Sequence, residues 1–216
     1  MGGTSQTGAP AFRLNPLAEA DKTGLYYSSI QLGHYRGAPS LSQVQDALER
    51  AAADAAEGRE EAARGRPPPA QYWVAEASGG SYVAYVGAHR DGPCYRFCVS
   101  FRTGLSARAR RAIVAAALSR LREVLVGVPC VYAQAINPRT YETYGFTTID
   151  RTTIRRKAPH KNRAPQRPMC VVAYAFESPD ERARSGAQCV QHTPARSSHS
   201  ANSTDAQCVS TLSSPT

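Results

Sequence analysis

Alternating or continuous apolar positions predict about seven short strands along this chain. Residues 72–77 and 81–88 flank a Ser-Gly-Gly turn, and they therefore predict an antiparallel hairpin. A second turn, residues 91–93, leads into a third strand at residues 94–101. The remaining strands are expected at residues 11–14, 130–135, 146–154 and 169–176.

Apolar residues that recur every three or four positions predict helices between these strands. One helix is expected over residues 21–32. A longer one is expected over residues 41–57, where Ser40 and Gln43 have the spacing of a capping box. Residues 58–69 are charged and end in three prolines, so we expect the chain to leave the helix and form a linker there.

A third amphipathic helix follows the third strand of the antiparallel set. Its apolar stripe begins at Leu105 and reaches Leu125, and Ser106 is placed to cap its start. Most of its arginines lie off this stripe. Gly127 and Pro129 are expected to end the helix.

A very short helix is predicted between the next two strands. Asn137 suits the N-cap position, and Pro138 suits the first helical position. Residues 139–144 then provide one or two turns. Gly145 supplies the left-handed residue that stops a helix.

In order, the elements are a strand, two helices, three antiparallel strands, a helix, a strand, a short helix and two strands. This order predicts a mixed α/β (α+β) domain over residues 11–177, with a mostly antiparallel sheet of about seven strands flanked by about four helices. Residues 1–10 and 178–216 are polar and lack hydrophobic periodicity. They predict a disordered lead and a disordered C-terminal tail.

Composition supports a soluble globular domain. The 216 residues are 42% hydrophobic and 20% charged, and no apolar run approaches the roughly 18 residues that a membrane span needs. The N-terminus has no signal-peptide pattern, and it lacks the Ser or Thr at position 6 that myristoylation favours. We therefore expect a cytoplasmic protein without a membrane partner, although these features do not separate cytoplasm from nucleus.

Cysteine spacing and charge bear on the choice of ligand. The six cysteines are scattered, and the Cys94–Cys98 spacing has no second half to complete a zinc site, so no metal is expected. The net charge of +9 favours anionic ligands or an acidic acceptor. The basic loop at residues 155–167 suits such an acceptor or nucleic-acid phosphates. It lacks interleaved aromatic residues, so a solvated loop is the simpler interpretation.

Three motifs give the chain a resemblance to a known family. Residues 141–146 read Tyr-Glu-Thr-Tyr-Gly-Phe after Asn137, residues 73–76 read Trp-Val-Ala-Glu, and residues 82–87 read Tyr-Val-Ala-Tyr-Val-Gly. With the element order above, these motifs make residues 11–177 similar to the GNAT superfamily of N-acetyltransferases. The resemblance implies transfer of an acetyl group from acetyl-CoA, the co-substrate, to a primary amine by direct attack.

The start of the third amphipathic helix is the candidate acetyl-CoA site. A helix N-terminus offers unpaired N–H groups to phosphate, and several nearby arginines add positive charge. In the family this loop reads R/Q-x-x-G-x-G/A and holds the pyrophosphate of acyl-CoA. Here Leu105 stands at the central glycine position and Gly104 lies one residue earlier. The alternative is a plain helix start with solvated arginines. The resemblance implies acetyl-CoA contacts from Phe101, Arg102, Thr103, Gly104, Leu105, Ser106, Ala107, Asn137 and Tyr141.

Tyr141 matches the tyrosine that protonates the leaving CoA thiolate in many members of the family. Packing beside Phe146 is the alternative role, and Tyr144 is another candidate for the acid. Asn137 precedes Tyr141 by four residues, whereas the family more usually has about seven. The helix that carries Tyr141 is therefore expected to be about one turn shorter.

No residue stands out as the base that deprotonates the amine. Glu76 on the hairpin and His34 in the loop between the first two helices are candidates by residue type, and many family members use ordered water. Two other functions stay open. An inactive GNAT-fold binding or interaction module is favoured by the displaced glycine and the short helix, and a nucleic-acid-binding protein would use residues 155–167. The acceptor and the oligomeric state are not predicted.

Overall fold

A computed structural model describes residues 12–33, 35, 37–150 and 170–176. The expected lead at residues 1–10, the basic loop at 155–167 and the tail at 178–216 lie outside the described residues. The same holds for residues 151–154, the second half of one expected strand.

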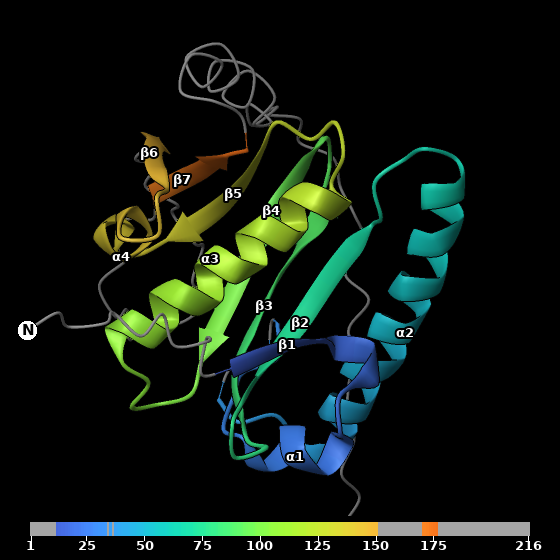
Figure 1. Cartoon of the computed structure of the whole chain (residues 1–216), viewed down its shortest axis with the longest axis vertical. Coiled ribbons are helices and arrows are strands. Elements are labelled where there is room, and N and C mark those ends of the chain that lie inside the picture. Colours follow the sequence, from blue (N-terminus) through green and yellow to red (C-terminus); the bar gives the residue numbers. More distant parts are fainter. Residues whose placement is uncertain (1–11, 34, 36, 151–169, 177–216) are drawn as a thin grey trace, which may run out of the picture.

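One seven-stranded sheet runs through the described part of the chain (Figure 1). Its strands are β1 (Phe12–Pro16), β2 (Ala70–Ala77), β3 (Tyr82–Asp91), β4 (Cys94–Phe101), β5 (Cys130–Ala135), β6 (Thr147–Asp150) and β7 (Cys170–Ala175). They lie in the order β1-β2-β3-β4-β5-β7-β6, and all neighbours pair antiparallel except β4 and β5. The expected mixed, mostly antiparallel sheet is confirmed.

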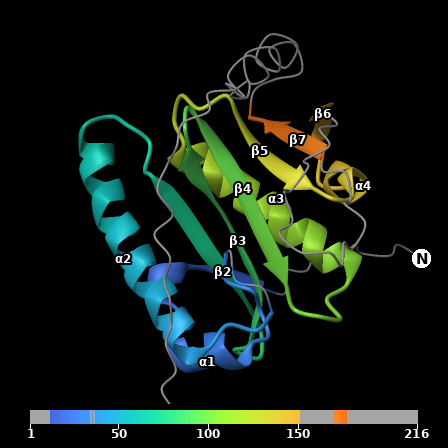
Figure 2. The same ribbon diagram turned by 180° about the vertical axis from the view of Figure 1, so that it is seen from behind.

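Helices cover both faces of this sheet (Figures 1 and 2). They are the 3-10 helix η1 (Leu17–Glu19) and the α-helices α1 (Lys22–Tyr27), α2 (Leu41–Ala63), α3 (Ala107–Val124) and α4 (Pro138–Glu142). Alternation along β2 separates two cores, because successive side chains of a strand point to opposite faces. Trp73 and Ala75 join the core beneath α3, whereas Val74 joins the core beneath α2.

The apolar stripe of α3 is buried as its spacing predicts. Ile113, Val114 and Leu121 have no exposed surface, and each contributes roughly 1.5–3 kcal/mol through burial. Ser106 caps the helix as expected, because its hydroxyl accepts a hydrogen bond from the Ala109 N–H at 3.2 Å. This helix holds β1 to β4 together from one side.

The expected helix at residues 21–32 is much shorter in the structure. Asp21 caps the start of α1 by accepting from the Gly24 N–H, but the helix ends at Tyr27. Ser28 Oγ donates to the Leu25 carbonyl at 2.7 Å, and Ser29 has a φ of 59°. Serine side chains that bond to nearby backbone compete with helix formation, which explains the early end.

The capping box of α2 is confirmed, but the helix continues well past the expected end at residue 57 to Ala63. The expected linker is therefore wrong in its first half. Gly58 is accommodated because Pro68 packs against it; an added Cβ would lie 3.0 Å from Pro68 Cβ. The helix ends at Ala63, and the prolines follow in the segment that leads to β2.

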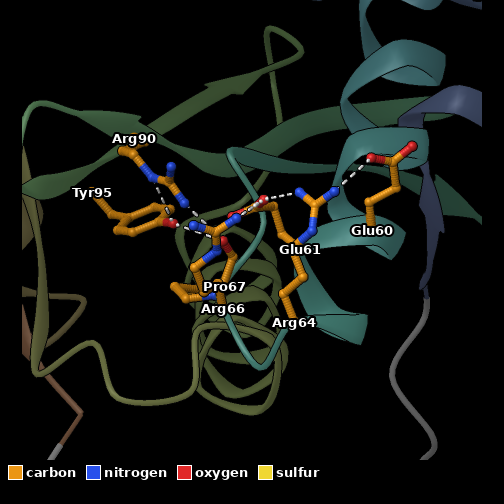
Figure 3. A network of polar contacts seen from close by, with 7 residues as sticks. All are labelled: Glu60, Glu61, Arg64, Arg66, Pro67, Arg90 and Tyr95. Carbon is orange, nitrogen blue, oxygen red and sulfur yellow. Dashed lines mark hydrogen bonds and ion pairs between the residues drawn. The ribbon is translucent and has the colours of Figure 1, made fainter.

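A buried carboxylate fixes the end of α2 (Figure 3). Glu61 is only 7% exposed, and its Oε1 accepts hydrogen bonds from Arg64 Nη1 at 3.1 Å and Arg66 Nη2 at 2.7 Å. The Arg66 N–H also donates to the Glu61 carbonyl at 2.8 Å. Residues just beyond the helix are thus tied to its last turn.

The proline run that follows is bound to the ends of β3 and β4 (Figure 3). Arg90 Nη2 donates to the Pro67 carbonyl at 2.8 Å, and the Tyr95 hydroxyl donates to the Pro68 carbonyl at 2.7 Å. These bonds hold α2 at a fixed position over the sheet. In the part of the chain that the structure describes, no helix has the length and apolar character that crossing a bilayer requires.

Candidate functional site

The sheet opens between β4 and β5. These parallel strands are in register over two pairs only, Tyr95 with Val131 and Arg96 with Tyr132. Both strands continue beyond these pairs and diverge (Figure 2). Arg96 Nη2 donates to Gln134 Oε1 at 3.0 Å across the start of this gap. Beyond Arg96, the edge of β4 that faces β5 has backbone groups available to a ligand.

The loop from β4 to α3 lies at the open end of the gap. Gly104 has a φ of 83° at the centre of this turn, a left-handed conformation that favours glycine. The Arg102 N–H donates to the Val83 carbonyl at 2.9 Å, which anchors the loop to β3. Residues 102–104 are exposed. The first turn of α3 therefore presents its free N–H groups next to an accessible loop.

Arg110 adds an unsatisfied donor to this helix start. Its Nε is buried and has no hydrogen-bond partner among the described residues. The guanidinium lies over the Phe101 ring, with Cζ 5.5 Å from the ring centroid. A buried donor without a partner costs roughly 1–3 kcal/mol. An anionic group that reached this nitrogen would satisfy it, so the local chemistry fits a phosphate.

Tyr141 lies on the other side of the gap, in α4. Its ring meets Phe146 edge-on at 5.3 Å and Tyr144 at 6.2 Å, so it contributes to packing. Burial raises the pKa of Tyr141 to about 12, with smaller contributions in the same direction from Cys98 and Tyr144 and an opposing one from Arg96. The hydroxyl is thus within electrostatic reach of β4 and stays protonated at neutral pH.

The short helix around Tyr141 is built largely as expected. Pro138 occupies the first helical position, and Gly145 follows the helix with a φ of 88°. Asn137 occupies the N-cap position, but its side chain makes no capping hydrogen bond. The expected capping by the Asn137 side chain is therefore wrong; the backbone carbonyl of Asn137 accepts from the Thr140 N–H at 3.3 Å instead.

Glu76, a candidate base, is placed away from the gap. It lies on β2 beside β1, and its Oε2 accepts from Asn15 Nδ2 at 2.5 Å. Strand β3 separates β2 from β4. Glu76 therefore lies two strands away from β4, the strand that borders the gap. His34, the other candidate, lies outside the described residues.

A cavity of about 380 Å³ lies between α2 and the sheet. It is lined by Leu17, Leu32, Gly33, Tyr35, Ala47, Arg50, Ala51, Asp54, Pro69, Ala70, Tyr72, Tyr85, His89 and Cys98. Tyr72 Oη and His89 Nδ1 are hydrogen-bonded at 2.5 Å, and Cys98 Sγ lies 4.0 Å from the same nitrogen. Cys98 belongs to β4, so the cavity adjoins the strand that borders the gap.

Sequence patterns alone do not predict that Tyr72, His89 and Cys98 lie together. Tyr72, Gly87 and Cys98 lie side by side across β2, β3 and β4, and His89 lies beside Arg96. The alternation within each strand places these residues on the face that α2 covers. The register between strands, which a single sequence does not reveal, brings them together.

Comparisons with known proteins agree with this architecture. No protein-family model matches the sequence, and no curated protein matches it either. One similar solved structure is the spermidine N-acetyltransferase SpeG from Vibrio cholerae in complex with CoA and spermine. Its TM-score is 0.52 at 12% identity, over 76% of this chain and 95% of that one.

A second is the Vibrio cholerae spermidine/spermine N-acetyltransferase SpeG in complex with manganese ions. It gives a TM-score of 0.53 at 11% identity, over 81% of this chain and 96% of that one. Similarity at such identities concerns the fold. This chain has the fold of the GNAT superfamily of N-acetyltransferases.

Proposed function

We propose that this protein transfers an acetyl group from acetyl-CoA to a primary amine by direct attack, without a covalent enzyme intermediate. The observation that carries the proposal is the β4–β5 gap, which has a phosphate-compatible helix start at one end and a protonated tyrosine beside it. The structural neighbour that was solved with CoA and spermine supports both kinds of ligand for this fold.

In this proposal the start of α3 holds the pyrophosphate of acetyl-CoA. Backbone N–H groups of the loop and first helical turn donate to it, and Arg110 Nε gains the partner that it otherwise lacks. Arg102, Gly104, Ser106 and Ala107 form the wall of this subsite, with Phe101, Thr103 and Leu105 completing the loop. Asn137 contributes from the start of α4.

Tyr141 serves as the proton donor. The amine attacks the thioester carbon, and collapse of the tetrahedral intermediate expels the CoA thiolate, which leaves more readily when protonated. Because burial raises the pKa of Tyr141 to about 12, its proton is present throughout the neutral range. The same ring also packs against Phe146, so the two roles that its sequence position suggests are compatible.

The acceptor amine would enter through the cavity beneath α2. Asp54 and Arg50 supply one carboxylate and one guanidinium to its wall, and the rest of the lining is largely apolar or aromatic. Acidic amines, which the net charge favours, are therefore tested as acceptors together with polyamines and amino acids. The compartment expected for the reaction is the cytoplasm.

A specific departure favours a second candidate, a GNAT-fold binding module without transfer activity. Leu105 stands where the family has its central glycine, so the backbone at this position lacks the conformational freedom of glycine. Calorimetric titration with acetyl-CoA and with free CoA separates the two. The enzyme requires saturable binding of acetyl-CoA and release of CoA thiol with at least one amine. Saturable binding without release supports the binding module, and no binding overturns the enzyme.

The variant Arg110→Ala tests whether the pyrophosphate binds at the start of α3. The variant loses the unsatisfied donor and should bind acetyl-CoA more weakly by roughly 1–3 kcal/mol. Arg122→Ala, in the last turn of the same helix, is the matched control and should bind as the wild type does. Equal affinity of all three proteins would contradict the placement of the pyrophosphate.

A further inference from the structure

We propose that Tyr72 and His89 act together as the proton acceptor for the amine. The proposal rests on the proposed function, since it assigns the residue pair that removes a proton from the acceptor during acetyl transfer. It differs from the candidates that residue type alone suggests, which are Glu76 and His34. Both Tyr72 and His89 line the cavity beneath α2, and their side chains are hydrogen-bonded at 2.5 Å.

Strand register places the pair next to the gap. His89 lies opposite Arg96, which is the last residue of β4 that pairs with β5. Cys98, two residues further along β4, lies beyond that last pair and contacts His89 Nδ1 at 4.0 Å. Tyr141 packs against the core beneath α3, on the face of the sheet opposite to the core that Cys98 packs against. The proton donor and the proposed proton acceptor therefore approach one segment of β4 from two sides.

The phenol of Tyr72 is held in place by its surroundings. Its ring stacks on Tyr85, with centroids 4.9 Å apart and planes inclined by 21°. It also lies across Gly87, where an added Cβ would be only 2.4 Å from Tyr72 Cδ1. A fixed hydroxyl between the cavity and an imidazole is the arrangement that a proton relay requires.

Proton transfer begins at the incoming amine. The acceptor enters as an ammonium ion and gives one proton to Tyr72 Oη, while Tyr72 gives its own proton to His89 Nδ1. The neutral amine then attacks the thioester carbon, forming the C–N bond. As the C–S bond breaks, Tyr141 protonates the thiolate, and the second amine proton restores Tyr141. His89 releases its proton to solvent, so the products are the amide, CoA thiol and one proton.

Tyr72 alone is a poor base, which is why the imidazole is needed. Burial raises the pKa of Tyr72 above its ordinary value, so the phenol hands a proton on and does not lose it to solvent. An imidazole, with an ordinary pKa of about 6.5, is neutral and ready to accept near pH 7.

Other charged and titratable groups face His89 from several elements. They are Tyr72 on β2, Tyr85 on β3, Arg96 and Cys98 on β4, and Arg50 and Asp54 on α2. Burial raises the pKa of Cys98, so the thiol stays uncharged beside His89.

The test measures kcat/KM against pH for the amine that the wild type acetylates fastest in a panel of aromatic monoamines, polyamines and amino acids. The base must be unprotonated, so the wild-type rate should fall as the pH drops through the imidazole pKa. His89→Gln should lower kcat/KM by roughly 10²–10⁴-fold and remove this acidic limb. Acetyl-CoA affinity, measured by calorimetry, should be unchanged.

Tyr72→Phe keeps the ring and removes the relay, so it decides the matter if His89→Gln does not fold. It should lose at least tenfold in kcat/KM, while Tyr27→Phe, an exposed tyrosine on α1, should lose nothing. A wild-type profile in either cavity variant overturns the proposal, as does loss of the acidic limb in Glu76→Gln alone. Failure of the wild type to bind acetyl-CoA or to release CoA overturns the proposed function itself.

Discussion

At the scale of single residues, Tyr141 combines burial with reach across the gap. Tyr141→Phe keeps the ring contacts with Phe146 and removes only the proton. We expect turnover to fall by roughly 10²–10⁴-fold with nearly unchanged acetyl-CoA affinity, because the proton is needed only as the thiolate leaves. Steady-state kinetics combined with calorimetry measure the two effects separately.

The basic side of the pH profile gives a second measurement on the same residue. An acid must be protonated, and the raised pKa of Tyr141, about 12, keeps it protonated as the pH rises through neutrality. Tyr141 should therefore produce no loss of rate below about pH 11. Tyr144→Phe is the matched control. If that variant loses more turnover than Tyr141→Phe, the acid is Tyr144.

Gly87 has no room for a side chain, because β2 lies very close to its Cα. A Cβ at this position would lie 2.2 Å from the Gln71 carbonyl oxygen and 2.4 Å from Tyr72 Cδ1. Gly87→Ala should therefore lower the free energy of unfolding by about 1–3 kcal/mol or more, as overpacking does. Gly79→Ala, where an added Cβ meets nothing within 4 Å, should stay within about 0.5 kcal/mol of the wild type. Equal urea midpoints for the two variants would contradict the close approach.

At the scale of elements, local patterns predicted the strands better than the helix ends. The predicted bounds of β4 and β5 agree with the structure, because alternation and flanking turn residues are encoded within each segment. The end of α2 depends on Glu61 binding arginines beyond the helix, and on prolines that bind β3 and β4. Such contacts between distant segments have no periodic signal.

Glu61 should stabilise the end of α2 much more than its neighbour Glu60 does. The Glu61 side chain is 9% exposed and binds two arginines, whereas the neighbouring Glu60 side chain is 68% exposed and lies 3.6 Å from Arg64. Glu61→Gln should lower the free energy of unfolding by about 1–3 kcal/mol, since the arginines then donate to a neutral oxygen and the ion pairs are lost. Glu60→Gln should change it by less than about 0.5 kcal/mol. Urea denaturation compares them, and similar losses would show that Glu61 does not fix the helix end.

The candidate site contains some residues that local sequence patterns indicate and others that they do not. The loop at residues 101–107 and Tyr141 lie in contiguous motifs, so the sequence could indicate them, and the acetyl-CoA roles that we give them remain proposals. Tyr72, His89 and Cys98 come from three strands and meet only through register. No spacing along the chain predicts that meeting.

At the scale of the whole molecule, the β4–β5 pair joins two parts of one sheet. Strands β1 to β4 are paired along their lengths, as are β5, β6 and β7, but only two residue pairs join the two sets. The two sets are also joined by the Arg96–Gln134 hydrogen bond and by apolar packing, in which the ring centroids of Phe97 on β4 and Phe146 lie 5.4 Å apart. A ligand in the gap would contact both sets and add to this weak junction.

Acetyl-CoA bound in the β4–β5 gap should stabilise the folded chain. Acetyl-CoA at about 100 times its Kd should stabilise the native state by about 2.7 kcal/mol if it binds only the folded chain. For a chain of this length that corresponds to a rise in Tm of roughly 5–10 °C. Hydrogen exchange should slow at the backbone amides of β4 and β5 beyond their last shared pair, because a ligand in the gap covers them. Arg110→Ala should reduce the rise at the same acetyl-CoA concentration, since its affinity is lower. A rise in Tm without added protection along these two strands would place the ligand elsewhere than in the gap.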